Sequence, residues 1–340
     1  MRVLQAMAGA AHGGAEAFFT RLAVALAGRG LDQRALVRPD PARMAALAAA
    51  GIPAETARFG GPFDLATGVR FRRAVAAWRP DVVMTWMTRA TVHCPRRRFV
   101  HLARLGGHYD LGRYRRADHL VVNSKGLRAW ATGKGWDESR VHHIPNFVDA
   151  TPARPVDRAT LATAAAAPVV LALGRLHPNK AFDVALSALA AVPRAVLWLA
   201  GEGPLGDELA RLAARLGVAD RVRFLGWRDD AAGLLAAADV LVCPSRHEPF
   251  GNVVLEAWAH GVPVVAARAA GPAELVTDGV DGLLADIDDA SALAAALERV
   301  LGDAGLARRL SAAGRAAHEA AYTEDKVAAA YLGLFARLAG

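Results

Sequence analysis

PSRHEPFGNVVLEAWAHGVP occupies residues 244–263 and follows directly on the apolar run of residues 240–243, which predicts a buried strand. Gly251 permits a close backbone approach, and apolar positions recur at helical spacing from Asn252 onward. Gly261 and Pro263 predict the end of that helix. The stretch therefore predicts a strand, a glycine-containing loop and a helix whose first turn offers backbone N–H groups to an anion such as phosphate.

Two carboxylates stand on either side of the predicted helix start, Glu248 before it and Glu256 in its second turn. The backbone N–H groups of Gly251, Asn252 and Val253 are the predicted phosphate contacts. Carboxylates beside a phosphate site do not bind the phosphate, but they accept hydrogen bonds from the hydroxyls of a sugar or a ribose. The stretch is therefore suited to a nucleotide that carries a sugar.

The segment EPFGNVVLEA, with Glu248 and Glu256 as E-x7-E, resembles the retaining glycosyltransferases of family 4, the group 1 transferases with the GT-B fold. This resemblance implies that Glu248 holds the donor sugar near its 3-hydroxyl and that Glu256 holds the nucleotide ribose. Residues 174–180, GRLHPNK, match the family pattern GRL-x-x-x-K, whose Arg and Lys, here Arg175 and Lys180, pair with the donor diphosphate. In the family, the backbone near Arg228 meets the base of the donor.

The first half of the chain carries a sparser resemblance. Gly13 and Gly14 match the family's GG-x-E loop, which covers the diphosphate and sugar of the donor. His108 follows the predicted strand of residues 99–105, where family members place a histidine near the acceptor oxygen. His101 competes for that assignment, and a surface-loop histidine is the alternative for His108.

Predicted strands alternate with predicted helices along the chain, which is typical of parallel α/β folds. With the resemblance, the pattern predicts two doubly wound Rossmann-like domains that face a cleft. We expect an acceptor-side domain over residues 1–150, a nucleotide-sugar-binding domain over residues 151–323, and a final helix over residues 324–340 that crosses back to the first domain. Residues 150–167 are predicted to form a linker.

We expect no metal and no cofactor, because the nucleotide-sugar is a substrate and cationic residues already serve the diphosphate. Asp286-Ile287-Asp288 resembles the D-x-D of metal-dependent transferases. It precedes the helix predicted over residues 290–301, so we assign it to helix capping instead. In the same-face mechanism proposed for the family, the leaving phosphate accepts the acceptor's proton.

Charge is distributed unevenly: residues 1–155 carry a net +13, whereas residues 156–340 carry −5. The basic half contains clusters at residues 96–98 and 113–116, which predict an anionic partner. We expect a glycan or glycolipid acceptor, such as a lipopolysaccharide core, on an anionic membrane surface. The predicted location is cytoplasmic and peripheral on the membrane, because we identify neither a signal peptide nor a membrane span. A small-molecule acceptor, with codon bias as the source of arginine, is the alternative.

Other classes of protein fit the sequence less well. A nicotinamide-dependent oxidoreductase requires G-x-G-x-x-G after the first strand, and that motif is absent. A nucleic-acid-binding protein would interleave aromatic and basic residues, yet aromatic residues make up 6% of the chain, so no nucleic acid is expected. A GT-B epimerase, hydrolase or phosphorylase stays open as an alternative within the same fold.

Overall fold

The computed structural model describes residues 1–10, 13–61, 64–96 and 98–340. They divide into two compact units, each built on a parallel sheet. Unit 1 contains Met1–Phe147 and Thr323–Gly340, and unit 2 contains Val148–Tyr322. No helix that the model describes is long and apolar enough to cross a membrane.

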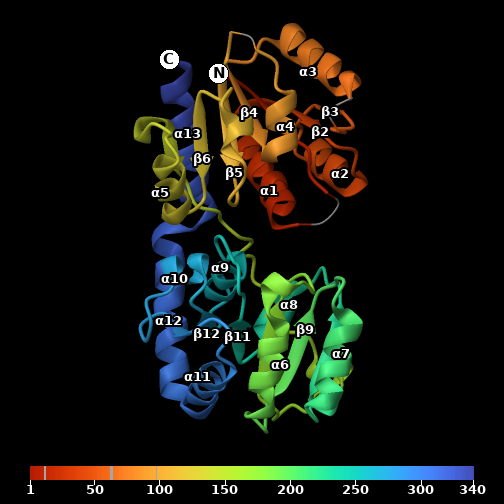
Figure 1. Cartoon of the computed structure of the whole chain (residues 1–340), viewed down its shortest axis with the longest axis vertical. Coiled ribbons are helices and arrows are strands. Elements are labelled where there is room, and N and C mark those ends of the chain that lie inside the picture. Colours follow the sequence, from red (N-terminus) through yellow and green to blue (C-terminus); the bar gives the residue numbers. More distant parts are fainter. Residues whose placement is uncertain (11–12, 62–63, 97) are drawn as a thin grey trace. The chain divides into compact units, whose positions relative to one another are not determined.

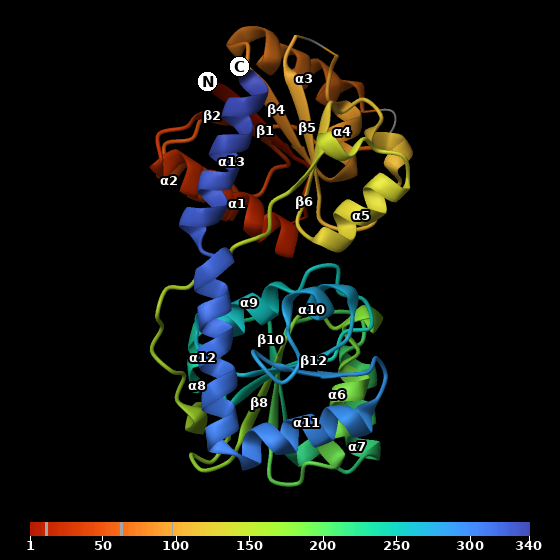
Figure 2. The same ribbon diagram turned by 90° about the vertical axis from the view of Figure 1, so that its left-hand side faces the viewer.

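Unit 1 holds a seven-stranded sheet in the order β3-β2-β1-β4-β5-β6-β7. The strands are β1 (Arg2–Met7), β2 (Asp32–Val37), β3 (Ala54–Thr56), β4 (Val82–Trp86), β5 (Val100–Leu105), β6 (His119–Val122) and β7 (Val141–His143). The helices are α1 (Gly14–Gly28), α2 (Pro41–Ala49), α3 (Leu65–Trp78), α4 (Met87–His93), α5 (Lys125–Gly133) and α13 (Glu324–Ala339). Each helix follows a strand except α13, which packs beside α1 (Figure 2).

Both faces of the unit 1 sheet are covered. One apolar cluster joins α1, α2 and α13 to the sheet, and two others join α3, α4 and α5 to the opposite face. All five residues of β4 are buried, as expected for a central parallel strand with helices on both sides. The short 3-10 helix η1 (Leu111–Tyr114) belongs to the crossover between β5 and β6, on the same face as α5.

Unit 2 holds a six-stranded sheet in the order β10-β9-β8-β11-β12-β13. Its strands are β8 (Val169–Leu173), β9 (Val196–Ala200), β10 (Val222–Gly226), β11 (Val240–Cys243), β12 (Val264–Ala267) and β13 (Leu283–Ala285). Its helices are α6 (Phe182–Ala190), α7 (Gly206–Arg215), α8 (Ala231–Ala237), α9 (Asn252–Ala259), α10 (Ala270–Leu275), α11 (Ala290–Gly302) and α12 (Ala304–Ala321) (Figure 1).

The two sheets share one topology. In each, the first three strands run outward in one direction and the fourth returns beside the first, so the strand order reverses between β1 and β4 and between β8 and β11. This is the doubly wound Rossmann-like pattern, and ligands of such sheets bind outside the carboxyl ends of the strands at the point of reversal. The predicted fold class is therefore confirmed, and the β8–β11 pair marks the expected ligand site of unit 2.

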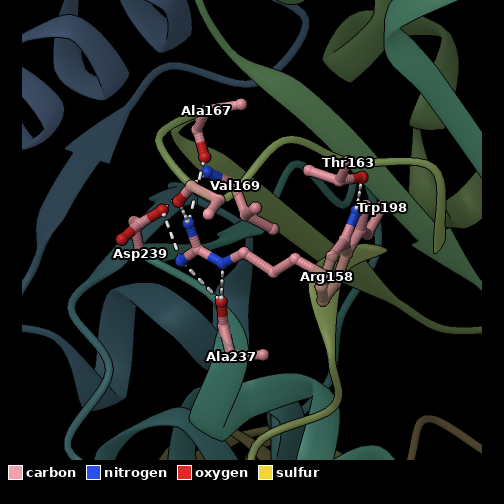
Figure 3. A network of polar contacts seen from close by, with 8 residues as sticks. Arg158, Thr163, Ala167, Val169, Trp198, Ala237 and Asp239 are labelled. Carbon is pink, nitrogen blue, oxygen red and sulfur yellow. Dashed lines mark hydrogen bonds and ion pairs between the residues drawn. The ribbon is translucent and has the colours of Figure 1, made fainter. Parts of the chain in front are cut away.

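Residues 150–167 do not form the linker that we predicted, but belong to unit 2. They contain the 3-10 helix η3 (Arg158–Leu161), and the Arg158 guanidinium donates hydrogen bonds to the carbonyl oxygens of Ala237 and Ala167 and pairs with Asp239 at 3.0 Å (Figure 3). The Asp239 carboxylate also accepts a 2.7 Å bond from the Val169 N–H. Val169 is the first residue of β8, and Asp239 directly precedes β11. The contacts of Arg158 therefore connect the amino ends of the two strands that define the point of reversal.

The Asp286-Ile287-Asp288 segment also differs from its predicted role. The N-cap of α11 is Asp289, whose side chain accepts a 2.8 Å bond from the Ala292 N–H. Asp286 and Asp288 pair instead with Arg268 and Arg246. The prediction chose the wrong carboxylates because three Asp residues lie within four positions and the chain turns at Asp288, which has a φ of 64°.

Candidate active site

The loop after β8 carries Arg175 and Lys180 and is held by backbone contacts to the next loop along the sheet. The Gly174 N–H donates to the Ala200 carbonyl at 3.0 Å, and the Leu176 N–H donates to the Glu202 carbonyl at 2.9 Å. Gly201 makes this stacking possible, because a Cβ at that position would lie 1.9 Å from the Gly174 carbonyl oxygen. The β8 loop is therefore positioned by close backbone packing before any ligand binds.

The loop after β11 carries Glu248. The His247 N–H donates to the Asn179 carbonyl at 3.1 Å, which ties this loop to the β8 loop, and the Gly271 N–H donates to the Glu248 carbonyl at 2.7 Å. Gly271 again has no room for a side chain, since a Cβ would lie 2.3 Å from the carbonyl group of Phe250. The β8 loop and the first turn of α10 thus hold the backbone around Glu248.

Lys180 and Glu248 meet at the point of strand reversal, with 2.5 Å between the Lys180 Nζ and the Glu248 Oε2. Their side chains are 24% and 13% exposed, so the pair is largely withdrawn from water but open on one side. Burial disfavours the charged amine, but attraction to Glu248 and the weaker field of Glu256 together raise the pKa of Lys180 above its ordinary value. Lys180 is therefore a fixed positive charge at neutral pH.

The first turn of α9 lies directly after this pair. Gly251 precedes it with a φ of 100°, a left-handed conformation that favours glycine, and no side chain caps the helix. Its amino terminus therefore presents backbone N–H groups and the positive end of the helix dipole beside the loop of Glu248. Glu256, half-buried in the second turn, is close enough to influence Lys180.

Arg175 and Arg228 differ in their hydrogen bonds and ion pairs within the protein. The Arg175 side chain is exposed and has no hydrogen bond or ion pair within the described ranges, so it is available to a ligand. Arg228 instead makes two hydrogen bonds to Asp230, at 2.7 and 2.6 Å, which raise the pKa of the guanidinium. Beside Arg228, Trp227 is 51% exposed at the carboxyl end of β10 and offers an apolar plane there.

Gly13 and Gly14 lie at the start of α1 in unit 1, Gly13 as its N-cap and Gly14 as its first residue. Glu16 folds back toward the preceding loop, and its Oε1 accepts a 2.8 Å bond from the Ala10 N–H. A Cβ on Gly13 would lie 2.3 Å from the Glu16 carboxylate, so the glycine permits this arrangement. Gly13 and Gly14 thus begin the helix that follows β1, a strand at the point of reversal in this unit.

His108 and His101 are separated clearly by their positions. His101 is buried inside β5, where its Nε2 lies 2.9 Å from the Thr85 hydroxyl oxygen, and burial lowers its pKa to about 4. His108 is exposed beyond the carboxyl end of β5, and its ring meets Trp130 edge-on at 4.8 Å. Of the two, only His108 is placed to reach a ligand.

Sequence reasoning missed Arg104, which is 2% exposed in β5. Its guanidinium lies over the rings of Phe18 and Trp86, at 4.7 and 4.6 Å. It also donates a 3.2 Å hydrogen bond to the Tyr331 hydroxyl on α13 and a second bond to the Asn146 side chain. The signal was an arginine inside the otherwise apolar run VHLARL, since a buried charge requires dedicated partners.

Comparison with known proteins agrees with this geometry. Residues 12–151 match the family model described as Glycosyltransferase Family 4, and residues 167–303 match the model described as Glycosyl transferases group 1. The chain is 38% identical over 327 residues to the lipopolysaccharide core biosynthesis glycosyltransferase LpsE of Rhizobium meliloti (strain 1021), which covers 95% of this chain and 96% of the relative. The chain belongs to the family 4, group 1 glycosyltransferases.

One further relative and one solved structure are also similar to this chain. LpsD of the same organism, also named a lipopolysaccharide core biosynthesis glycosyltransferase, is 38% identical over 334 residues and covers 96% of each chain. A crystal structure of Anabaena Alr3699/HepE in complex with UDP and glucose has a TM-score of 0.86 at 24% identity, covering 99% of this chain and 100% of that chain. This likeness shows the GT-B fold. Family membership decides against the oxidoreductase and the nucleic-acid-binding alternatives.

Proposed function

We propose that this glycosyltransferase moves a sugar, with retention of anomeric configuration, from a nucleotide-sugar donor to a hydroxyl of a lipopolysaccharide-core-type acceptor, without a metal ion. One observation carries the proposal: Lys180 and Glu248 meet at 2.5 Å beside the amino terminus of α9, which no side chain caps. A cation and a helix start suit a diphosphate, and the adjacent carboxylate suits the hydroxyls of the attached sugar. The UDP and glucose bound to HepE support the same donor class.

In the proposed reaction, the bond between the sugar's anomeric carbon and the diphosphate oxygen breaks while the acceptor oxygen bonds to that carbon from the same face. The acceptor hydroxyl proton passes to the departing phosphate oxygen. Lys180, Arg175 and the start of α9 stabilise the negative charge that develops on the diphosphate, which is an electrostatic contribution to catalysis. Glu248 orients the donor sugar and Glu256 the ribose. By the family resemblance, Gly13 and Gly14 contact the donor and His108 lies near the acceptor oxygen.

The metal-independent part of the proposal rests on the arrangement of cations. Lys180 keeps its charge because attraction to Glu248 raises its pKa, and Arg175 is unpaired within the described part of the chain. The same part of the chain contains no group of three or more His, Cys, Asp or Glu residues that could hold a metal ion. The positive charge that the leaving diphosphate requires is thus supplied by side chains and backbone.

We also propose that unit 1 docks on an anionic membrane surface. A cavity of about 830 Å³ on this unit is lined by the side chains Arg72, Arg89, Arg96, Arg113 and Arg116, which we call the arginine surface. Leu65 and Val92, which also line it, are 79% and 43% exposed, and Val69, next to the lining residue Gly68, is 55% exposed. Arginines that bind phosphates, next to exposed apolar side chains, suit a lipid headgroup region. Arg97 of the predicted cluster at residues 96–98 lies outside the described residues.

The proposed reaction is tested by incubating the enzyme with a panel of nucleotide-sugars and a deacylated lipopolysaccharide core, with excess chelator present throughout. We expect transfer from one donor, and proton NMR should show that the product keeps the anomeric configuration of that donor. An inverted product would contradict retention. Loss of activity in chelator, with recovery on addition of Mg²⁺ or Mn²⁺, would contradict metal independence.

Two substitutions test the roles of the carboxylates separately. Glu256→Ala should weaken the binding of the free nucleoside diphosphate by about 1–3 kcal/mol, as expected for a lost charge-assisted hydrogen bond. Glu248→Ala should leave that affinity intact but reduce turnover, because it removes a contact to the sugar. Isothermal titration calorimetry and initial rates measure both effects, with the exposed Glu298→Ala as control. Equal losses of diphosphate affinity in the two variants would argue against this division of roles.

A further inference from the structure

Unit 1 carries a second cavity, a groove of about 610 Å³. It lies between the crossover after β5, which includes η1, and the helix α5 with the turn that follows it. The residues that decide its chemistry are the aromatic side chains Tyr109, Trp130 and Trp136 and the cationic side chains Arg115, Lys134 and Arg140. We call this cavity the aromatic groove.

The aromatic groove offers apolar planes. Trp130 and Trp136 are half-buried and pack on the apolar cluster beneath α5, and Tyr109 stacks on Tyr114 with 6.1 Å between ring centroids. The C–H faces of sugar rings are apolar and weakly positive, and they pack against the negative faces of aromatic rings. A groove of several hundred cubic ångströms is large enough for more than one sugar ring.

The groove also has cations that no internal partner satisfies. Arg115 and Lys134 are exposed, and within the described ranges neither side chain makes a hydrogen bond or an ion pair. The two carboxylates of the groove are already used locally: Asp110 accepts from the Gly112 N–H, and Asp137 accepts from the Ser139 N–H and hydroxyl. The groove is therefore suited to carboxylate or phosphate groups on its ligand.

The aromatic groove adjoins a residue assigned to the reaction. Trp130, which lines it, is the side chain that the His108 ring meets edge-on at 4.8 Å. A ligand in the groove therefore lies beside the Trp130 ring that His108 contacts. Because His108 is proposed to lie near the acceptor oxygen, the ligand expected in the adjoining groove is the acceptor.

We infer that the aromatic groove binds the part of the acceptor next to the hydroxyl that is glycosylated, and that it selects an anionic oligosaccharide, with sugar rings on the aromatic planes and carboxylate or phosphate groups on Arg115 and Lys134. This inference rests on the proposed function, since it names the acceptor chemistry of the same reaction. If so, the choice of acceptor depends on charged groups of the acceptor other than the hydroxyl that reacts.

The kinetic test compares the double variant Arg115→Ser/Lys134→Ser with Arg211→Ser/Arg215→Ser, which removes the same charge from the exposed face of α7 in unit 2. With deacylated, phosphorylated lipopolysaccharide core as acceptor, we expect the groove variant to raise the acceptor KM at least tenfold. The donor KM, and the rate with a neutral alkyl hexoside as acceptor, should not change. Equal acceptor KM values for wild type and groove variant would overturn the inference.

A binding measurement separates failure of this inference from failure of the proposed function. Calorimetric titration of the donor-free protein with the same phosphorylated core should show binding that weakens at least tenfold in the groove variant and in high salt. This result is expected even where no acceptor is glycosylated. The inference fails if neutral maltotriose binds as tightly as the phosphorylated core, if the groove variant binds the core as well as wild type does, or if a single-stranded oligonucleotide binds better than the core.

Discussion

Lys180 keeps its positive charge in a largely buried position because Glu248 lies 2.5 Å from its Nζ. Each partner satisfies the other before a ligand binds, so neither is an isolated buried charge. In the proposed donor complex, the diphosphate takes over the contact to Lys180 and the sugar hydroxyls donate to Glu248. We therefore expect the ion pair to hold both side chains in place until the donor binds.

His101 makes stability depend on pH. Burial lowers its pKa to about 4 in the folded chain, against about 6.5 in the unfolded chain, so the unfolded state binds its proton first as the pH falls. The contribution of neutral His101 to stability is complete above pH 6.5 and is lost between pH 6.5 and 4. This loss amounts to about 3 kcal/mol, since one pKa unit corresponds to about 1.4 kcal/mol.

The measurement is the free energy of unfolding by urea at several pH values. His101→Gln should remove most of this decline, because Gln can still bond Thr85 but does not titrate. The control is His247→Gln, which makes the same substitution at an exposed position. His142, whose pKa burial also lowers to about 4, adds a decline of the same sign in every variant. A His101→Gln profile parallel to wild type would refute the assignment.

Loops, more than helices or strands, position the candidate site of unit 2. The loops after β8, β9 and β11 are joined by backbone hydrogen bonds, and glycines at their contacts allow the backbones to touch. The strands bring these loops to one edge of the sheet, but the site's geometry depends on contacts a few residues beyond each strand end.

Gly201→Ala tests this view. The Cβ would lie 1.9 Å from the Gly174 carbonyl oxygen, and the φ of 144° is unfavourable for alanine, so the β8 loop must move. We expect a loss of about 1–3 kcal/mol in stability from overpacking, and weaker binding of the nucleoside diphosphate through displaced Arg175 and Lys180. Gly217→Ala is the matched control, because Gly217 also has a positive φ, 68°, but open space around its Cβ position. Urea midpoints and calorimetry measure both effects, and equal behaviour of the two variants would show that the loop contact is unimportant.

On unit 1, the arginine surface brings basic side chains together with the exposed apolar side chains Leu65 and Val92. The arginine surface draws its residues from α3, from α4 and the segment after it, and from η1 and the segment after it. No internal carboxylate pairs with Arg72, Arg89 or Arg96 in the described part of the chain. Near an anionic membrane each such residue contributes on the order of 1 kcal/mol, provided it lies within about 8 Å of the surface at physiological salt.

Sedimentation with lipid vesicles tests the proposed docking. Arg72→Ser/Arg89→Ser/Arg96→Ser should weaken binding to anionic vesicles by roughly 100-fold, since three contributions of about 1 kcal/mol are lost. Nucleoside diphosphate affinity should not change. Arg211→Ser/Arg215→Ser/Arg308→Ser serves as the control of equal charge. The anionic-surface proposal would be ruled out if binding did not depend on lipid charge and salt concentration, or if wild type did not bind the vesicles.

The sequence by itself determined the local features of this protein. Apolar runs predicted strands such as residues 169–173 and 240–243, because a strand buried on both faces must be apolar throughout. Glycine and proline positions predicted where α9 begins and ends. The motif residues Glu248, Glu256, Arg175 and Lys180 could be named as candidates, because their spacing within one loop or helix is a local property.

Only the tertiary structure decided which distant residues meet. Lys180 and Glu248 are 68 positions apart and touch because the sheet order places β8 beside β11. The same holds for Arg158 and Asp239 beneath those strands, and for Arg96 and Arg116, which line one cavity. Hydrophobic periodicity records which face of an element is buried, but it carries no information on which strands become neighbours. That choice depends on the burial of all the elements together, and it alone assembles the candidate site.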